Sequence, residues 1–324
     1  MAQPNHITEL RSLVTDLYDH SYSQELAVSK IHEIHQIFTT LSGVSGNEMV
    51  VKYLAAVPTA TGMALSMNHA AQCLLDYKRT VMFIKGFINA IKDVRNAKSG
   101  EQVHIFYAGC GPYAPFFTMI APLFSREEVR FTMLEINEDS LHSAKALCAN
   151  LGLEAYVEEW IQADATQHQL EDADHYDILF SETLDALLYR ESYVPIMWNF
   201  RRQLKSDVTI IPANVTIEFS IHQKEERHIQ RVFDTQESVA HHIDSNILPD
   251  AIGEKSIPIK EYEPFDSWIL DTIVHIYKDT KLLRNESSLT LPLLQNHNNE
   301  DKRSYRFNYV LSPQVEFRVS RDSA

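Results

Sequence analysis

The chain has 324 residues, of which 44% are hydrophobic and 23% charged, and these proportions describe a globular protein rather than a disordered or membrane-embedded one. Its length predicts about two domains, or one large core with additions. Lysine and arginine total 29 against 44 aspartates and glutamates, and the resulting net charge of -15 repels a phosphate backbone, so nucleic acid is not expected as a partner.

The predicted location follows from features that the sequence lacks. No apolar stretch reaches the roughly 20 residues of a membrane-spanning helix, and the first residues, MAQPNHITELRSL, have neither the basic start nor the apolar run of a signal peptide. The cysteines Cys73, Cys110 and Cys148 are widely spaced and form no C-x-x-C pair. We therefore expect a cytoplasmic protein with reduced thiols and no membrane partner.

The first hundred residues follow a helical pattern. Apolar residues recur every three or four positions between Leu10 and Phe38, and a further helical block runs from about Met63 to Ala97. The turn-forming pair Ser99-Gly100 ends that block. We assign residues 1–100 to a helical N-terminal cap.

From residue 101 short apolar runs alternate with longer helical ones, which is typical of a parallel sheet wound with helices. The predicted strands cover residues 103–108, 129–136, 155–161, 176–181 and 208–211. Beyond Pro212 strand follows strand, at residues 215–221, 268–277, 304–311 and 315–320. The sequence thus predicts an α/β domain over 101–212 and a β-rich C-terminal domain over 213–324.

A glycine turn follows the first strand of the α/β domain. Only 9 residues of the chain are glycine, yet Gly109 and Gly111 stand two apart at this point, which favours a backbone that passes close to a ligand over a plain tight turn. The next strand ends in Glu135, which is placed to accept hydrogen bonds from both hydroxyls of a ribose. Together they indicate a cofactor that contains a nucleoside.

Two enzyme classes share this arrangement. Gly109, Gly111 and Ala114 fit the G-x-G-x-x-A turn of an NAD-dependent oxidoreductase, whereas a methyltransferase that uses S-adenosylmethionine needs only the first two small residues. Asp164 and Ala165 follow the third strand, where a polar residue could bind an adenine ring or simply cap a helix. These residues alone leave both classes open.

Two glutamates, Glu182 and Glu191, follow the fourth strand nine residues apart. A guanidinium group is a planar fork of five donors, and two carboxylates match it. The alternative without a ligand is that one of these two glutamates caps a helix and the other lies on a solvated helix face.

At these glutamates the sequence resembles the protein arginine methyltransferases, whose signature has Ser-Glu after this strand and a second glutamate nine residues on, followed by serine. Two further segments resemble the family, Leu74–Thr80 with the pattern L-x-D-x-x-R-T and Ile210-Ile211-Pro212, so that the likeness covers roughly residues 63–222. It implies a class I methyltransferase with a Rossmann-like sheet.

The resemblance also implies roles for individual residues. It makes Arg79 the partner of the cofactor carboxylate, and it places Gly109 and Gly111 under the methionine part of S-adenosylmethionine. Glu135 would bind the ribose. Asp164, with Ala165, would lie near the adenine. Glu182 and Glu191 would hold the guanidinium of the acceptor.

The chain departs from the family on the acceptor side. Two tyrosines that the family has before the Arg79 helix are absent from residues 59–66, and no Thr-His-Trp triplet follows in the C-terminal part. The long helical cap suits a small acceptor enclosed in a closed site. We therefore expect an N-methyltransferase acting on a guanidino or amine group of a small molecule or peptide, with a homodimer as its candidate assembly. The alternatives are an O- or C-methyltransferase of a secondary metabolite and an NAD-dependent oxidoreductase.

No metal site is expected from the sequence. His32 and His35 form an H-x-x-H pair and His241 adjoins His242, but neither pair has a nearby cysteine or a clear third ligand.

Overall fold

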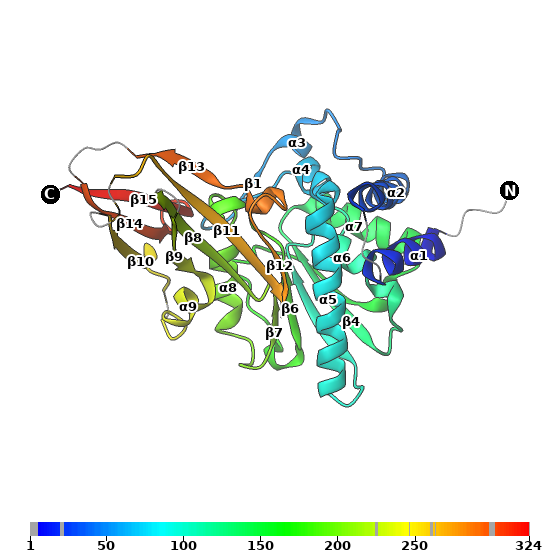
Figure 1. Ribbon diagram of the computed structural model, residues 1–324. Helices are drawn as coiled ribbons and strands as arrows, with labels where there is room; N and C mark the ends of the chain where they lie inside the picture. The colour runs from blue at the N-terminus through cyan, green and yellow to red at the C-terminus, as the bar shows by residue number, and fades with distance from the viewer. Residues whose placement is uncertain are drawn as a thin grey trace.

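In the computed structural model one long helix, α5 (Tyr77–Ala97), lies between the N-terminal helices, the parallel sheet and the C-terminal strands (Figure 1). The structure describes residues 6–19, 23–223, 226–245, 247–259, 262, 264–297 and 302–323. Within these ranges, no helix is both long enough and apolar enough to cross a bilayer.

The N-terminal part is helical, as predicted. Its elements are α1 (His6–Asp19), α2 (Gln24–Ser42), α3 (Val51–Leu54), β1 (Val57–Pro58), β2 (Met63–Ala64), α4 (Met67–Gln72) and α5. Helices α1 and α2 pack on each other and on α5, because each turns an apolar face inward, such as Leu10, Val14 and Leu17 of α1.

The prediction of one continuous helical block from Met63 to Ala97 is wrong, because the structure divides this segment. Residues 57–64 form a small β1–β2 hairpin, and α4 is separated from α5 by a short 3₁₀ turn, Cys73–Leu75. The break comes from Asp76, whose carboxylate accepts a hydrogen bond from the Arg79 N–H and so begins a new helix. The same carboxylate accepts hydrogen bonds from Ser287 and Ser288, which ties the start of α5 to the C-terminal part.

Five parallel strands form the central sheet, in the order β5-β4-β3-β6-β7. They are β3 (Val103–Ala108), β4 (Val129–Glu135), β5 (Val157–Gln162), β6 (Ile178–Ser181) and β7 (Thr209–Ile211). The strand order reverses between β3 and β6, and such a switch point opens a crevice at the carboxyl ends of the strands. The predicted α/β architecture is confirmed.

The helical runs that the alternating pattern predicts over residues 112–124 and 185–204 are shorter in the structure. The helices between the strands are α6 (Pro115–Thr118), α7 (Glu138–Leu151) and α8 (Tyr193–Arg201). The segment before α8 is a loop, because the Asp185 carboxylate accepts hydrogen bonds from the N–H groups of Tyr189 and Arg190 and so competes with helical bonding. This loop carries both predicted acceptor-binding glutamates.

The C-terminal part is β-rich, as predicted. Its elements are β8 (Asn214–Gln223), β9 (Glu226–Asp234), α9 (Thr235–Ala240), β10 (Ala251–Pro258), β11 (Ser267–Tyr277), β12 (Thr280–Leu282), β13 (Leu293–Asn296), β14 (Lys302–Val310) and β15 (Glu316–Ser323). One antiparallel sheet has the order β12-β11-β8-β9 with β13 beside β11, and the other has the order β10-β14-β15.

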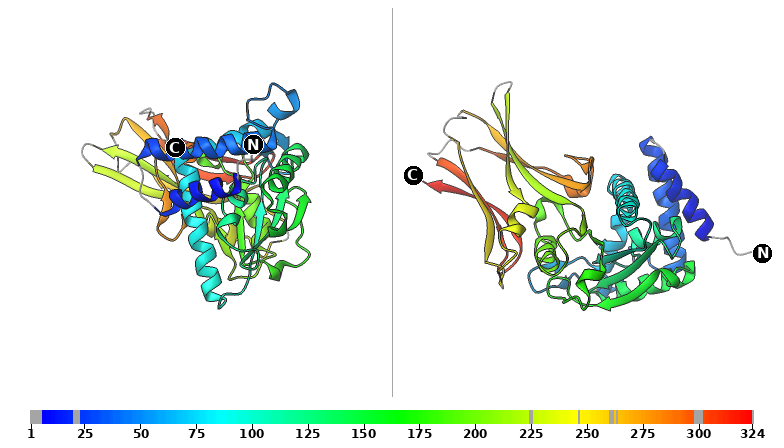
Figure 2. Two further views of the ribbon diagram at one scale, coloured as in Figure 1. Left: turned by 90° about the vertical axis from the view of Figure 1, so that its right-hand side faces the viewer. Right: turned by 90° about the horizontal axis from the view of Figure 1, so that it is seen from below.

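An aromatic core joins these two antiparallel sheets. Phe219 of β8 contacts Tyr305 and Phe307 of β14, and Phe233 of β9 contacts Tyr309. Figure 2 shows both sheets on the side of α5 away from α1. The domain limits predicted at residues 100 and 212 fall in the connections before β3 and before β8, and as domain boundaries they stay predictions.

Helix α5 also contacts the C-terminal part directly, through a glycine. A Cβ on Gly86 would lie 2.5 Å from Cγ2 of the buried Ile276 on β11, so the lack of a side chain sets how closely α5 approaches the strand.

We expect Gly86→Ala to destabilise the protein although alanine favours a helix by ~1 kcal/mol. Overpacking against Ile276 should lower the free energy of unfolding by about 1–3 kcal/mol, measured from urea unfolding. Asn96→Ala, at an exposed position of the same helix, is the control and should leave stability within about 0.5 kcal/mol. A Gly86→Ala protein as stable as the parent would contradict this account of the packing.

Candidate functional site

One cavity at the carboxyl ends of the parallel strands brings together the eight residues that the sequence analysis assigned to the cofactor and the acceptor. They are Arg79, Gly109, Gly111, Glu135, Asp164, Ala165, Glu182 and Glu191. They come from α5, from the last residue of β4 and from the segments that follow β3, β5 and β6. Parallel strands place these segments at one edge of the sheet, which is why residues more than a hundred positions apart share a cavity.

The glycine turn is fixed by main-chain contacts. Gly109 and Gly111 have φ angles of 75° and 66°, a region that favours glycine, and the Gly109 N–H donates to the Leu134 carbonyl over 2.8 Å. A Cβ on Gly109 would overlap the methyl group of Thr183, so the turn is packed directly against the segment after β6. The backbone conformation therefore requires glycine at both positions. At Gly109 the close contact with Thr183 also leaves no space for a side chain.

Glu135 supports the same turn from the end of β4. Its Oε2 accepts a hydrogen bond from the Gly111 N–H at 2.7 Å and its Oε1 accepts one from the Asn137 N–H at 2.9 Å. Burial raises the pKa of this carboxyl, and the two backbone donors work in the opposite direction. Each oxygen keeps a further lone pair, so Glu135 can also accept hydroxyl donors of a ligand in the cavity.

Asp164 uses both carboxylate oxygens within the protein. Its Oδ1 accepts hydrogen bonds from the N–H and hydroxyl of Thr166, within a turn at residues 165–167 and not at the start of a helix. Its Oδ2 accepts the Ala60 N–H at 2.8 Å, in the turn of the β1–β2 hairpin. The side chain therefore anchors that hairpin at the cavity wall, next to the buried Ala165.

Arg79 and Glu182 form a buried ion pair. The Arg79 Nε–H donates to Oε1 of Glu182, and its Nη2 donates to the Glu182 carbonyl at 3.4 Å. Burial raises the pKa of the Glu182 carboxyl, and the positive charge of Arg79 opposes that rise. The residue expected to hold a cofactor carboxylate and a residue expected to hold the acceptor are therefore partners of each other here.

Glu191 has a different environment. Only 8% of the residue is exposed, and among the described residues no hydrogen-bond partner is found for its carboxylate. Burial, reinforced by the neighbouring charge of Asp185, raises its pKa to about 8. This cavity wall thus holds a carboxyl group that takes up a proton near neutral pH.

Sequence reasoning missed the contribution of the β1–β2 hairpin. Thr59, Met63 and Ala64 line the cavity, and the Thr59 hydroxyl lies 2.9 Å from the hydroxyl of Ser192, directly after Glu191. This hairpin occupies the stretch where the tyrosines of the resembling family are absent. The local signal in the sequence is a run of small and turn-forming residues, Thr59–Gly62, directly before the predicted helical block.

The sequence matches no family model and no curated protein. Among solved structures, it is similar to protein arginine methyltransferase 10 of Arabidopsis thaliana, with 12% identity over 78% of this chain and 96% of that one and a TM-score of 0.50. The chain has the fold of that enzyme. A second similar structure is PRMT1 in the enzyme–prozyme heterotetrameric complex of Trypanosoma brucei with AdoHcy, with 13% identity, 77% and 96% coverage and a TM-score of 0.46.

The structural likeness agrees with the resemblance that the sequence carries. It confirms the predicted fold, a Rossmann-like parallel sheet with a helical N-terminal extension and a β-rich C-terminal part. At 12% identity the likeness concerns the fold and not the acceptor.

The raised pKa of Glu191 predicts how stability varies with pH. The folded state keeps a proton on this carboxyl up to about pH 8, whereas the unfolded chain loses it near its usual pKa of 4.5, so the free energy of unfolding falls as pH rises between these values. Glu191→Gln removes this titration and should stabilise the protein above pH 8 by on the order of 2–4 kcal/mol relative to its effect at pH 4. Urea unfolding across this pH range measures it.

The matched control is Glu101→Gln, at an exposed position. It should reproduce the pH dependence of the parent protein. If Glu191→Gln does so as well, the Glu191 carboxyl titrates at its ordinary pKa in the folded state.

Proposed function

We propose that this protein is an S-adenosylmethionine-dependent methyltransferase that transfers a methyl group to nitrogen, on a guanidino or amine group of a small molecule or peptide. The observation that carries the proposal is the position of Glu191. Its buried carboxyl, for which the described residues provide no hydrogen-bond partner, lies in the same cavity as the glycine turn, Glu135 and Glu182. A cationic or readily protonated nitrogen would stabilise the Glu191 carboxylate, because it supplies a positive charge and hydrogen-bond donors.

The cavity fits the cofactor in its residue types. Gly109 and Gly111 let the backbone approach a ligand, Glu135 offers lone pairs to ribose hydroxyls, and Arg79 is a donor for a carboxylate. Asp164 and Ala165 form the wall assigned to the adenine. When bound, S-adenosylmethionine supplies an electrophilic methyl group on a sulfonium sulfur.

The local structure after the turn does not favour the alternative of an NAD-dependent oxidoreductase. A pyrophosphate is usually held by the N-terminus of a full helix after the glycines. Here Ala114 has a φ of 41°, and α6 behind it is a single turn of four residues.

The two glutamates on the acceptor side differ in their availability to a ligand. Glu182 is neutralised by Arg79, so the first carboxylate available to an incoming cation is that of Glu191. When Arg79 turns to a cofactor carboxylate, Glu182 becomes available as the second acceptor. Holding one nitrogen at near-attack distance lowers the barrier, because the encounter no longer costs orientation entropy.

Methyl transfer to oxygen or carbon of a secondary metabolite is the second candidate. The Arg79–Glu182 pair favours it, because a pair that persists in the loaded enzyme leaves Glu191 alone at the acceptor. A carboxyl group with a pKa near 8 can accept a hydroxyl proton as a general base.

Assembly and location stay predictions for this chain. A homodimer agrees with a group of exposed apolar side chains at and before α3, namely Met49, Val50, Val51 and Leu54. The cytoplasm remains the predicted location, and the net charge of -15 still argues against nucleic acid as a partner.

We expect the protein to bind S-adenosylmethionine and its demethylated product, but not NAD, with micromolar affinity by calorimetry, about -8 kcal/mol. Glu135→Gln should weaken this binding about tenfold or more, because the new amide would meet a backbone N–H donor where the carboxylate accepts one. Glu138→Gln, exposed on the first turn of α7, is the control and should bind like the parent. A melting temperature raised by NAD and not by the methyl donor would overturn the methyltransferase proposal.

For the acceptor, we expect methyl transfer to at least one of four classes: free arginine, other guanidino compounds, amines and arginine-containing peptides. Mass detection identifies the product. Glu182→Gln and Glu191→Gln keep the side-chain shape but cannot carry a negative charge, so each should lower turnover by on the order of 10²-fold or more. Cofactor affinity should change little in Glu191→Gln. The control is Glu101→Gln. Near-normal turnover in both variants would shift the assignment to transfer onto oxygen or carbon.

A further inference from the structure

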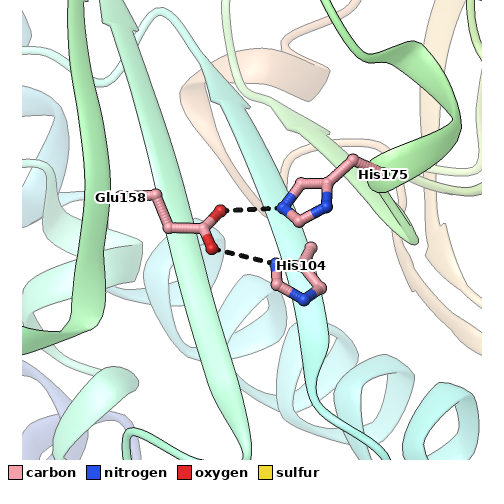
Figure 3. A group of neighbouring side chains, drawn as sticks. All are labelled: His104, Glu158 and His175. Atoms are coloured by element: carbon pink, nitrogen blue, oxygen red, sulfur yellow. Dashed lines mark hydrogen bonds and ion pairs between the residues drawn. The ribbon is translucent and has the colours of Figure 1, made fainter.

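Three potential metal ligands meet at the end of the parallel sheet opposite the cavity. His104 lies near the start of β3, Glu158 near the start of β5, and His175 ends the 3₁₀ turn Ala173–His175 before β6. Figure 3 shows their side chains pointing toward one another. None of the three lines the cavity described above.

Their geometry is close to that of a coordination sphere. Nδ1 of His104 lies 3.1 Å from Oε1 of Glu158, and Nε2 of His175 lies 3.1 Å from Oε2 of the same carboxylate. One ligand atom from each residue lies within 4.8 Å of the other two. Ligand atoms around tetrahedral zinc, with bonds of ~2.0–2.1 Å, stand about 3.3 Å apart, so small side-chain shifts bring all three onto one ion.

The backbone of the edge strand is adapted at this point. β4 and β5 pair Phe131 with Val157 and Thr132 with Glu159, so Glu158 is an extra residue in a β-bulge. A bulge disturbs the ladder and commonly redirects a side chain. Here it carries the carboxylate that both histidines contact.

The surrounding charges suit a cation. Lys98 and Lys205, the nearby lysines, are held by the carboxylate of Asp177 at 2.7 and 3.1 Å. The exposed acids Glu159 and Asp172 lie near Tyr176, which follows His175.

We propose that His104, Glu158 and His175 bind a divalent transition metal ion, with zinc as the best match. Two imidazoles and one carboxylate are ligands that zinc accepts in a tetrahedral site, with water in the fourth position. The side chains are 17%, 24% and 35% exposed for His104, Glu158 and His175, so the ion can enter from solvent.

The ion would join β3, β5 and the β5–β6 connection. That connection begins with Asp164 and Ala165 at the cavity and ends at His175. Zinc would therefore clamp the far end of a segment whose near end forms the cavity wall. The proposed role is structural and does not depend on methyl transfer.

The first test titrates zinc into protein freed of metal with a chelator, in competition with a chromophoric zinc indicator. We expect one zinc per chain and a melting temperature that rises with zinc. His104→Gln and His175→Gln should each weaken binding at least tenfold, and the double variant should abolish it. His142→Gln, at an exposed position of α7, is the control and should bind like the parent. Parent protein without stoichiometric binding below about 100 μM zinc, or histidine variants with parental affinity, would overturn the proposal.

A second test needs no variant and so does not depend on how the variants fold. Diethyl pyrocarbonate modifies accessible histidines, and peptide mass spectrometry locates the products. Zinc should protect His104 and His175 in the parent protein and leave His142 reactive. Equal modification of all three histidines with and without zinc would rule the site out. Neither test uses methyl donor or acceptor, so the outcome is independent of the proposed methyltransferase activity.

Discussion

The buried ion pair between Arg79 and Glu182 holds the site together. It joins α5, the helix that contacts all three parts of the molecule, to the end of β6, where the sheet opens. Burying two charges costs several kcal/mol per ion, and this cost is offset in part because the charges meet directly and Arg79 also donates to the Glu182 carbonyl. A ligand that draws Arg79 away therefore exposes a carboxylate in the same movement. In the proposed function, the cofactor and acceptor sites are coupled through this one guanidinium.

Three carboxylates of the cavity differ because their partners differ. Glu135 accepts backbone N–H groups and supports the glycine turn, Glu182 faces an arginine, and Glu191 has no partner within the described chain. The same residue type thus serves as a structural acceptor, one half of an ion pair and a titratable group. The three glutamates differ because the hydrogen-bond donors, the charged neighbours and the burial around each carboxylate differ.

The parallel sheet carries the cavity and the cluster of His104, Glu158 and His175 at opposite ends of its strands. The cavity residues lie at the carboxyl ends of its strands, and the two histidines and Glu158 lie near the amino ends. The β5–β6 connection links the two ends, because it starts at the cavity wall and returns to the opposite end before β6 begins. A constraint placed on His175 therefore acts on the same segment as Asp164.

The sequence by itself determined the α/β sheet and the helical and β-rich flanks, because hydrophobic periodicity is a local property. Its glycine turn, the acidic residues after the strands and the family resemblance pointed to eight of the residues that line the cavity. Only the tertiary structure decided their partners. Arg79 and Glu182 are 103 positions apart, and no spacing predicts their pairing. His104 and His175 are 54 and 17 positions from Glu158, with no motif to join them. The hairpin at residues 57–64 lies within the part assigned to the helical cap, because strands of two residues carry no periodicity that a sequence could show. Such features arise from packing between distant segments, which local patterns do not encode.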